Sequence, residues 1–404
     1  MTRALARTIV PLVFMGSISL PAAVGQRAAP APAVIALELE GRHVIVQATV
    51  NKSRPLSFVL DTGADRAIIR TDVAKELGLK LEGQINGRGA GPGVQSGSFV
   101  RNATWSLVGL TGFSQPMTLA LPLPAISAAM GRSIDGIVGG EFIKQFVVEL
   151  DYQAKLMRLH TPATFTYSGA GETVPIDFIE ATHPTIAAKV TPVGGRPIEG
   201  RFMFDIGSGL ALALHSPFVR TQKLLDGGLP TIRAIGSAGA GGKVAGRVGR
   251  VESLQIGSFT LSQPFTMFAQ DDAGAFANAA LAGNIGAQIA MRFHIFLDYS
   301  RRRMILEPTP GVRAPFDRAF AGFALRASGS NFRTLRITEI LEKSPASDAG
   351  LEVGDELTAI DGVSVEQLSL SAVNEMFEKP VRYTLTIRRG DRTQDVVLTP
   401  ARLI

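Results

Sequence analysis

Short segments in which apolar and polar residues alternate recur along the chain, separated by breaks rich in glycine and proline. Residues 44–50 and 99–107 alternate or run apolar at the two-residue period of a β-strand. The chain contains 43 glycines and 23 prolines but a single tryptophan, a balance typical of proteins with many turns. The pattern therefore predicts a mainly β fold.

Two short segments depart from this pattern and are predicted to be helices. In the first, Thr71 is expected to cap residues 72–77, and Gly78 to end the helix. In the second, Ser216 is expected to cap residues 218–225, with a proline in the first turn. Each segment follows an aspartate-containing turn, so the two predicted helices occupy matching places in the sequence.

The sequence also repeats itself. Residues 58–64 (FVLDTGA) match 202–208 (FMFDIGS), 137–139 match 284–286, and 150–152 match 297–299. The spacing is 144 residues at the first match and 147 at the two later ones. Ordered matches at nearly constant spacing predict two structurally equivalent halves.

Each repeat places an aspartate, Asp61 or Asp205, at the end of an apolar strand, with a glycine two residues later. A pseudo-twofold axis between the halves would bring the two carboxyl groups face to face. Such a pair shares one proton, because two neighbouring carboxylates cannot both ionise cheaply. The ionised member can take a proton from water while the protonated member polarises a carbonyl. The alternative is that both aspartates are only turn residues.

Residues 58–65 closely resemble the active-site loop of retropepsin-like aspartic proteases, and the duplication looks like the single-chain, two-lobed type that occurs in bacteria. The resemblance covers roughly residues 34–308. It implies a polypeptide substrate and an aspartic endopeptidase activity without a cofactor or a metal, with Asp61 and Asp205 as the catalytic pair. It also implies that the adjoining loop residues support the pair; these are Thr62, Gly63, Ala64, Ile206, Gly207 and Ser208.

The family closes over its substrate with β-hairpin flaps, and two glycine-rich segments, residues 87–97 and 236–246, lie at suitable distances after the aspartates. Flexible surface loops are the alternative for each segment. In the family, a strand after the flap ends in an apolar-apolar-Gly element that packs beneath the catalytic loop. Residues 137–139 and 284–286 resemble this element, although Asn284 is an unusual residue in it.

Ile206 departs from the family, which usually has threonine at this position. The resemblance implies that Thr62 donates its hydroxyl across the interface, but the reciprocal contact from the second loop would be absent. We therefore expect the Thr62 hydroxyl to face a methyl group and to lack one buried partner. This departure is the support for an alternative function, in which a pseudoprotease binds peptides or acts as a scaffold without cutting.

A third region, residues 316–398, resembles a bacterial PDZ domain through motifs that fall in order: SPA at 344–346, AGL at 349–351, VGDEL at 353–357 and IDG at 360–362. Such domains bind an extended peptide at a sheet edge and hold its terminal carboxylate on backbone amides. A C-terminal peptide is therefore a possible partner, although such grooves also bind internal segments or the protein's own chain. The alternative is a fold retained for packing alone. The resemblance places the peptide-binding loop at Gly322, Phe323, Ala324 and Leu325.

Composition excludes several other kinds of site. The 404 residues include no cysteine, which excludes a thiol nucleophile, a disulfide framework and thiolate metal sites. Five scattered histidines exclude most histidine-based metal motifs. Neither Gly-x-Ser-x-Gly nor His-Glu-x-x-His occurs, which disfavours a serine hydrolase and a zinc protease. The net charge of +6 is dispersed, so nucleic acid is not an expected partner.

Residues 1–25 are typical of a secretory signal, with a basic start, an apolar stretch and small residues at 23–25. A retained membrane anchor is the alternative. Removal of the signal would leave no apolar segment long enough to cross a bilayer, and we expect an exported protein that is periplasmic or secreted. The expected division of the chain is 1–25 signal peptide, 26–33 linker, 34–162 first protease lobe, 163–308 second lobe and 316–404 PDZ domain.

Overall fold

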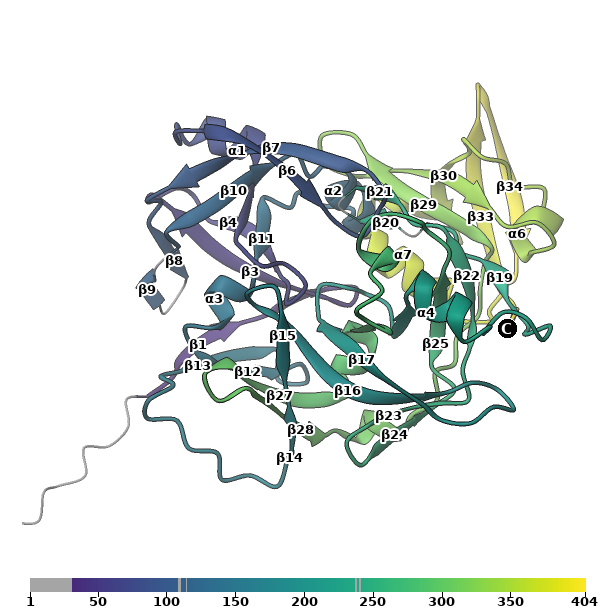
Figure 1. The fold of residues 1–404 in the computed structure, drawn as a ribbon. Coiled ribbons are helices and arrows are strands. Elements are labelled where there is room, and N and C mark those ends of the chain that lie inside the picture. Colours follow the sequence, from purple (N-terminus) through teal and green to yellow (C-terminus); the bar gives the residue numbers. More distant parts are fainter. Residues whose placement is uncertain (1–30, 108–109, 114, 237, 240) are drawn as a thin grey trace, which may run out of the picture.

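The computed structural model describes residues 31–404 except residues 108–109, 114, 237 and 240 (Figure 1). The expected signal peptide and most of the expected linker lie outside the described residues. The fold is mainly β, as the alternating pattern predicts. No helix in the described part of the chain is long and apolar enough to span a bilayer.

The first half of the protein is built on a large sheet with the strand order β6-β7-β10-β5-β11-β4-β3-β8-β9, in which β2 also pairs with β3. Its strands are β2 (Glu38–Glu40), β3 (His43–Val50), β4 (Leu56–Leu60), β5 (Ile68–Arg70), β6 (Glu82–Arg88), β7 (Val94–Arg101), β8 (Trp105–Leu107), β9 (Leu110–Phe113), β10 (Met117–Leu121) and β11 (Gly136–Val138). The strand β11 runs parallel to β4 and antiparallel to β5, so it lies between them directly beneath the turn that carries Asp61.

The second half is built on a sheet with the order β19-β22-β25-β18-β26-β17-β16-β23-β24, in which β15 also pairs with β16. Its strands are β15 (Asp177–Ile179), β16 (His183–Thr191), β17 (Ile198–Asp205), β18 (Leu212–Leu214), β19 (Ile232–Arg233), β22 (Gly246–Arg250), β23 (Ser253–Ile256), β24 (Phe259–Ser262), β25 (Phe265–Ala269) and β26 (Gly283–Gly286). A short hairpin of β20 (Ala238–Gly239) and β21 (Gly242–Lys243) lies between β19 and β22. Taken strand by strand, the order is the same as in the first half.

A third sheet joins the halves and has the order β1-β13-β12-β27-β28-β14. We call it the seam sheet; its strands are β1 (Ala33–Ala36), β12 (Val147–Asp151), β13 (Leu156–His160), β14 (Glu172–Pro175), β27 (Phe293–Asp298) and β28 (Arg303–Pro308). The central pair is antiparallel β12 and β27, where Glu149 lies opposite Phe296. The apolar core is continuous across both halves, whereas the C-terminal domain has a separate core.

The two predicted helices are present, but their predicted caps are wrong. Helix α1 (Thr71–Glu76) and helix α4 (Ser216–Thr221) begin at the residues that were expected to cap them. The hydroxyls of Thr71 and Ser216 are buried and have no hydrogen-bond partner. Arg70 and His215 stand at the N-cap positions instead, and α4 ends at Thr221 rather than residue 225. Further helical segments are α2 (Pro124–Met130), α3 (Gly140–Ile143), η1 (Ala275–Ala277), α5 (Ala287–Ala290), η2 (Tyr299–Arg301) and η3 (Pro310–Arg313).

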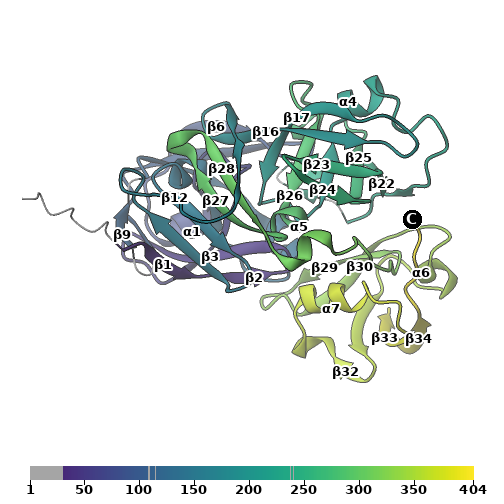
Figure 2. The ribbon, with the colours of Figure 1, turned by 90° about the horizontal axis from the view of Figure 1, so that it is seen from below.

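The C-terminal domain contains a sheet of order β29-β30-β31-β33-β34, in which β32 pairs with β31. Its elements are β29 (Phe323–Ser328), β30 (Thr334–Ile340), α6 (Pro345–Asp348), β31 (Glu356–Ile360), β32 (Val363–Ser364), η4 (Val365–Gln367), α7 (Leu370–Met376), β33 (Tyr383–Arg389) and β34 (Arg392–Leu398). The domain lies against both halves, with β29 and β30 on the near side (Figure 2). The strand β29 is at one edge of this sheet.

Candidate active site

Each aspartate is positioned by a buried strand. In the first half, Phe58 and Leu60 of β4 are fully buried, and Asp61 follows directly after that strand. In the second half, Phe202 and Phe204 of β17 are buried in the same way, and Asp205 ends the strand. Burial of the apolar side chains fixes the register of each strand, because a shift by one residue would turn them outward. The aspartates therefore leave the sheets at equivalent points.

The structure brings the two carboxyl groups into contact, so that each influences the pKa of the other. The glycines of both loops make this approach possible. A Cβ atom on Gly207 would lie 2.1 Å from Asp61 Oδ1, and one on Gly63 would lie 2.8 Å from Asp205 Oδ1. Each half thus places a glycine against the carboxylate of the other half, where any side chain would collide with it.

Thr62 connects the two loops through the backbone. Its hydroxyl donates a hydrogen bond to the carbonyl oxygen of Phe204 over 2.6 Å and accepts one from the amide of Ile206 over 3.0 Å. The hydroxyl is fully buried and satisfied. The expectation that it would lack a partner opposite Ile206 is therefore wrong, because its partners are main-chain atoms that any residue would supply. The Ile206 side chain itself is buried in the continuous core.

The loops continue in the same way in both halves. The carbonyl oxygen of Ala64 accepts a hydrogen bond from the amide of Gly140 over 2.8 Å. The carbonyl oxygen of Ser208 accepts one from the amide of Ala287 over 2.7 Å. These bonds tie each aspartate loop to the short helix that follows β11 or β26, so the loops are held from beneath as well as across the interface.

The two carboxylates have different hydrogen-bond partners. Asp61 Oδ1 accepts a bond from the amide of Gly63 over 2.7 Å. Asp205 Oδ1 accepts a bond from the amide of Ser208 over 3.1 Å, and its Oδ2 accepts one from Asn284 Nδ2 over 2.9 Å. The side-chain donor from Asn284 has no counterpart in the first half, since Ile137 occupies the matching position on β11.

Asn284 is in turn held by His215. The Nε2 atom of His215 lies 2.8 Å from Asn284 Oδ1, and its Nδ1 atom lies 3.0 Å from the carbonyl oxygen of Asn278. Burial lowers the pKa of His215, while its contacts with Asn278 and Asn284 oppose that shift. Asn284 stands out in the sequence as unusual, whereas His215 does not. A comparison of the repeats could have indicated His215, because the equivalent position, the last residue of β5, holds Arg70 instead of a histidine.

The electrostatics of the pair follow from these contacts. Burial, together with the neighbouring Asp205 charge, raises the pKa of Asp61 to about 8. Burial also raises the pKa of Asp205, but the bonds from Asn284 and the loop amides oppose that rise. Hydrogen bonds to a carboxylate favour its charged form. Near neutral pH we therefore assign the shared proton to Asp61 and the negative charge to Asp205.

The two glycine-rich segments expected to form flaps contain hairpins, and the tips of these hairpins meet. In the first half, β6 and β7 are joined by residues 89–93; in the second, the hairpin of β20 and β21 occupies residues 238–243, of which residue 240 lies outside the described part. The amide of Gly93 donates a hydrogen bond to the carbonyl oxygen of Gly241 over 2.8 Å. A Cβ atom on Gly241 would lie 2.6 Å from the carbonyl oxygen of Gly91, so the tips touch through bare backbone.

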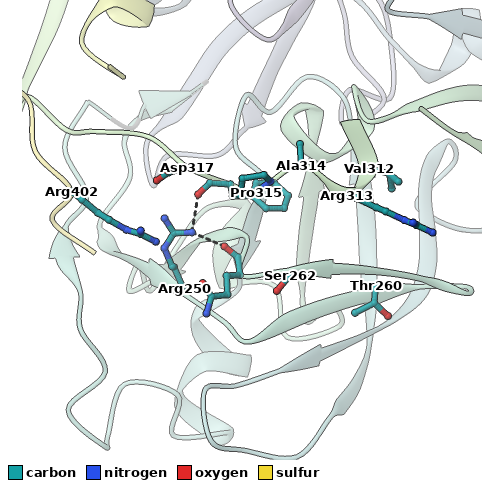
Figure 3. A pocket seen from close by; sticks show the side chains of 11 residues that line it. Arg250, Thr260, Ser262, Val312, Arg313, Ala314, Pro315, Asp317 and Arg402 are labelled. Carbon is teal, nitrogen blue, oxygen red and sulfur yellow. Dashed lines mark hydrogen bonds between the residues drawn. The ribbon is translucent and has the colours of Figure 1, made fainter. Parts of the chain in front are cut away.

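A separate cavity of about 410 Å³ lies between the second half and the C-terminal domain (Figure 3). Arg250 projects into it and donates hydrogen bonds of 2.8 Å to the carbonyl oxygens of Gln263 and Phe316. Its charged lining consists of Arg250, Arg313, Arg402 and Asp317. The lining has one carboxylate, Asp317, and neither Asp61 nor Asp205 belongs to it. The cavity is therefore not suited to chemistry that needs two carboxyl groups. Among the described residues, no cluster of three or more acidic or histidine side chains is arranged to hold a metal ion.

The loop predicted to bind peptides lies at the start of the edge strand β29. Gly322 has φ +86°, and a Cβ there would lie 2.2 Å from Ser344 Oγ. Phe323 packs edge-on against Phe377, while Ala324 and Leu325 continue along the strand. These residues are therefore contiguous with the sheet edge at which such a domain would add a peptide strand.

Comparison with protein families finds two matches. An aspartyl protease family matches residues 46–142, a range that contains Asp61 but not Asp205. The PDZ domain family matches residues 312–388. A search of curated proteins finds no match. The chain thus contains an aspartyl protease domain and a PDZ domain, and the equivalence of the second half rests on the repeat and on its strand order.

Proposed function

We propose that the protein is an aspartic endopeptidase in which a water molecule held between Asp61 and Asp205 attacks a peptide carbonyl. The observation that supports this most strongly is the contact between the two carboxyl groups, with one member from each half of the repeat. The raised pKa of Asp61, about 8, keeps a proton on the pair near neutral pH. A shared proton is what acid and base catalysis by two carboxyl groups requires.

The proposed step uses both charge states at once. The Asp205 carboxylate takes a proton from water, and the water oxygen bonds to the carbonyl carbon as the C=O double bond becomes single. The Asp61 carboxyl group donates its proton to the carbonyl oxygen, which leaves a neutral gem-diol. A proton then passes from Asp205 to the amide nitrogen as the C–N bond breaks, and a diol hydroxyl returns its proton to Asp61. Both aspartates end as they began.

The substrate class is an extended polypeptide, and the touching hairpins would have to separate to admit it. We also propose that the protein is exported, on the strength of its N-terminal sequence. The alternative is a peptide-binding pseudoprotease. The departure at Ile206 suggested it, but the Thr62 hydroxyl has both of its partners with isoleucine in place, so this position does not favour it.

A digest of a peptide library at several pH values tests the proposal. Wild type is compared with Asp61→Asn and Asp205→Asn, and each substitution should reduce cleavage by about 10²–10⁴-fold because the pair acts as a unit. Thermal melting confirms that the variants fold. Substantial turnover in either variant would exclude the mechanism. A folded wild type without cleavage on any peptide, but with measurable peptide binding, would favour the pseudoprotease.

A further inference from the structure

The peptide groove of a PDZ domain lies between its edge strand and the neighbouring helix, here β29 and α7. In this protein helix α2 of the first half packs against β29. Gly131, which ends α2, reaches the other wall of the groove: a Cβ atom there would lie 2.4 Å from the Cβ atom of Leu370, the first residue of α7. Helix α2 and the residue that follows it therefore contact both walls of the groove.

There is no room for a peptide strand while α2 stays in this position. An added strand would lie about 4.8 Å from β29, and a helix is about 10 Å wide with its side chains. The Cα atoms of α2 and β29 approach within 8 Å. The side of α2 outside the first-half core is formed largely by alanines, which permits this close approach. A covering helix also protects an edge strand from unwanted pairing.

The same face of the domain holds the hairpin of the second half. Glu339 of β30 accepts a hydrogen bond from the amide of Gly236 over 3.3 Å and forms ion pairs with Arg233 and Lys243 at 3.2 and 3.3 Å. Arg326 of β29 donates a bond of 2.7 Å to the carbonyl oxygen of Gly236. The segment before β20 and the end of β21 are thereby fixed to the domain. Helix α2 contacts β20 as well, so the groove and the hairpin share one set of contacts.

We propose that α2 is an internal occupant of the PDZ groove and that the PDZ domain holds the second hairpin closed. A peptide with a free terminal carboxylate would compete with α2 for β29 and loosen the hairpin. Two further contacts hold the first half against the PDZ domain: Ser371 of α7 donates a hydrogen bond to Glu40, and Arg42 pairs with Glu378 at 2.8 Å. We call the contacts that hold α2 and the second hairpin against the PDZ domain the latch. The effect on catalysis rests on the proposed function, whereas occupation of the groove does not.

Because the chain has no cysteine, two introduced cysteines can form one defined disulfide that is made by oxidation and opened by reduction. A Cβ atom on Gly41 would lie 3.8 Å from the Cβ of Ser371, a separation that suits a disulfide. The variant Gly41→Cys/Ser371→Cys should therefore link the first half to α7 when oxidised. Each single-cysteine variant is the matched control. Gly41 has φ +57°, so the Gly41→Cys control carries the same backbone cost as the double variant.

Peptide binding is measured in an Asp61→Asn background, so that the probe is not cut. The probe is a pool of fluorescent octapeptides that end in valine, and the same pool as C-terminal amides is the reference. Oxidation of the double variant should weaken binding of the free-carboxylate pool at least about tenfold. Reduction should restore it, and oxidation should not affect the single variants. Equal binding by the oxidised and reduced forms would overturn the proposal.

Glu339→Gln provides a second test that needs no crosslink. Loss of its ion pairs should loosen the latch, and the affinity for the free-carboxylate pool should rise by a few-fold, up to about tenfold. Glu342→Gln on the following loop is the matched control, and it should leave binding unchanged. An unchanged affinity in Glu339→Gln would show that the hairpin and the groove are not linked.

Turnover separates this proposal from the enzymatic one. With the active chain, the octapeptide pool should raise cleavage of a quenched peptide in wild type but not in the oxidised double variant, because only the wild type can release α2 and loosen the hairpin. If the affinities of the variants for the octapeptide pool differ as expected but no peptide is cleaved, occupation of the groove by α2 is supported and the protease assignment fails. If cleavage occurs but is unaffected by the pool, the link to the hairpin is refuted.

Discussion

The two halves share one strand order but support their aspartates by different means. The first half contributes Thr62, whose hydroxyl bonds to backbone atoms on both sides of Asp205. The second half has Ile206 at that position and provides instead a polar chain, from His215 through Asn284 to Asp205. Mechanical support therefore comes from the first half and electrostatic support from the second. The comparison teaches that a duplicated fold can divide between its copies two tasks that a symmetric pair would perform twice.

The different pKa values of Asp61 and Asp205 predict how the cleavage rate depends on pH. Because the pKa of Asp61 is raised to about 8, the rate should fall about tenfold per pH unit above that value as the pair loses its last proton. At the acid end, the rate should fall as Asp205 is protonated, at a pH above the ordinary range for aspartate. Initial rates on one peptide between pH 3 and pH 10 would show both limbs. A rate that stays level above pH 9 would contradict the assignment.

The stability of the fold supplies an independent measurement. Between about pH 4 and pH 8 folded Asp61 keeps a proton that the unfolded chain has lost, so stability falls as pH rises through this range. Asp61→Asn removes that dependence. Between pH 4 and pH 8 the free energy of unfolding of the wild type should therefore fall by at least about 1.4 kcal/mol more than that of the variant, the equivalent of one pKa unit. Urea unfolding at the two pH values measures it. An identical pH dependence in both proteins would show that the pKa of Asp61 is not raised.

Asn284→Ile makes the second half copy Ile137 of the first. Loss of the amide donor should raise the pKa of Asp205, because its charged form loses a hydrogen bond, and should move the acid limb of the rate profile to higher pH. The alkaline limb, which belongs to Asp61, should move little. Ile137→Val is the matched control and should leave the profile in place. An acid limb that does not shift in Asn284→Ile would mean that the polar chain does not set the charge of Asp205.

Thr62→Val tests the mechanical side of the comparison. The substitution keeps the side-chain shape but leaves the backbone groups of Phe204 and Ile206 unpaired, and it should cost about 1–3 kcal/mol of stability. Thr118 is a suitable control, because its hydroxyl is buried without a partner. Thr118→Val should be neutral or stabilising. Melting temperatures of the two variants decide the point, and equal values would show that the Thr62 bonds do not brace the interface.

Ile206→Thr should have the smallest effect on turnover. Thr62 already has both of its partners, so the new hydroxyl completes no missing contact, and the buried unpaired hydroxyl with the loss of apolar volume should cost about 1–3 kcal/mol of stability. Turnover should stay within about threefold of wild type. Calorimetry and peptide turnover on the same preparation provide the test. A large gain in activity would show that the isoleucine had impaired the site.

Much of this arrangement could be predicted from local pattern and internal repetition. Strands such as β3 are visible because their apolar residues alternate, and Asp61 and Asp205 are visible because FVLDTGA recurs as FMFDIGS. The helix caps were predicted wrongly, because the hydroxyls of Thr71 and Ser216 turn into the protein instead of capping. A hydroxyl at the start of an apolar segment does not reveal which way it will point.

The remaining features depend on contacts between distant parts of the chain. His215 and Asn284 are 69 residues apart, and no local period connects them. The approach of α2 to β29 depends on how a separately folded domain docks against the first half. Sequence motifs indicate that the domain has a peptide groove but cannot show that a helix from another part of the same chain lies in it.

The seam sheet has a consequence for how the halves recognise one another. Its local twofold passes through the pair formed by Glu149 and Phe296, which occupy matching positions in the repeat. If two copies of the first half associated through β12, Glu149 would face Glu149, and like charges directly opposite each other destabilise a sheet. In the intact chain Glu149 pairs with Arg158 and His160 of its own half and also meets His294 of the second half at 3.0 Å. The duplicated sequence thus carries a built-in bias against self-pairing, which favours joining unlike halves of one chain over exchanging like halves between two chains.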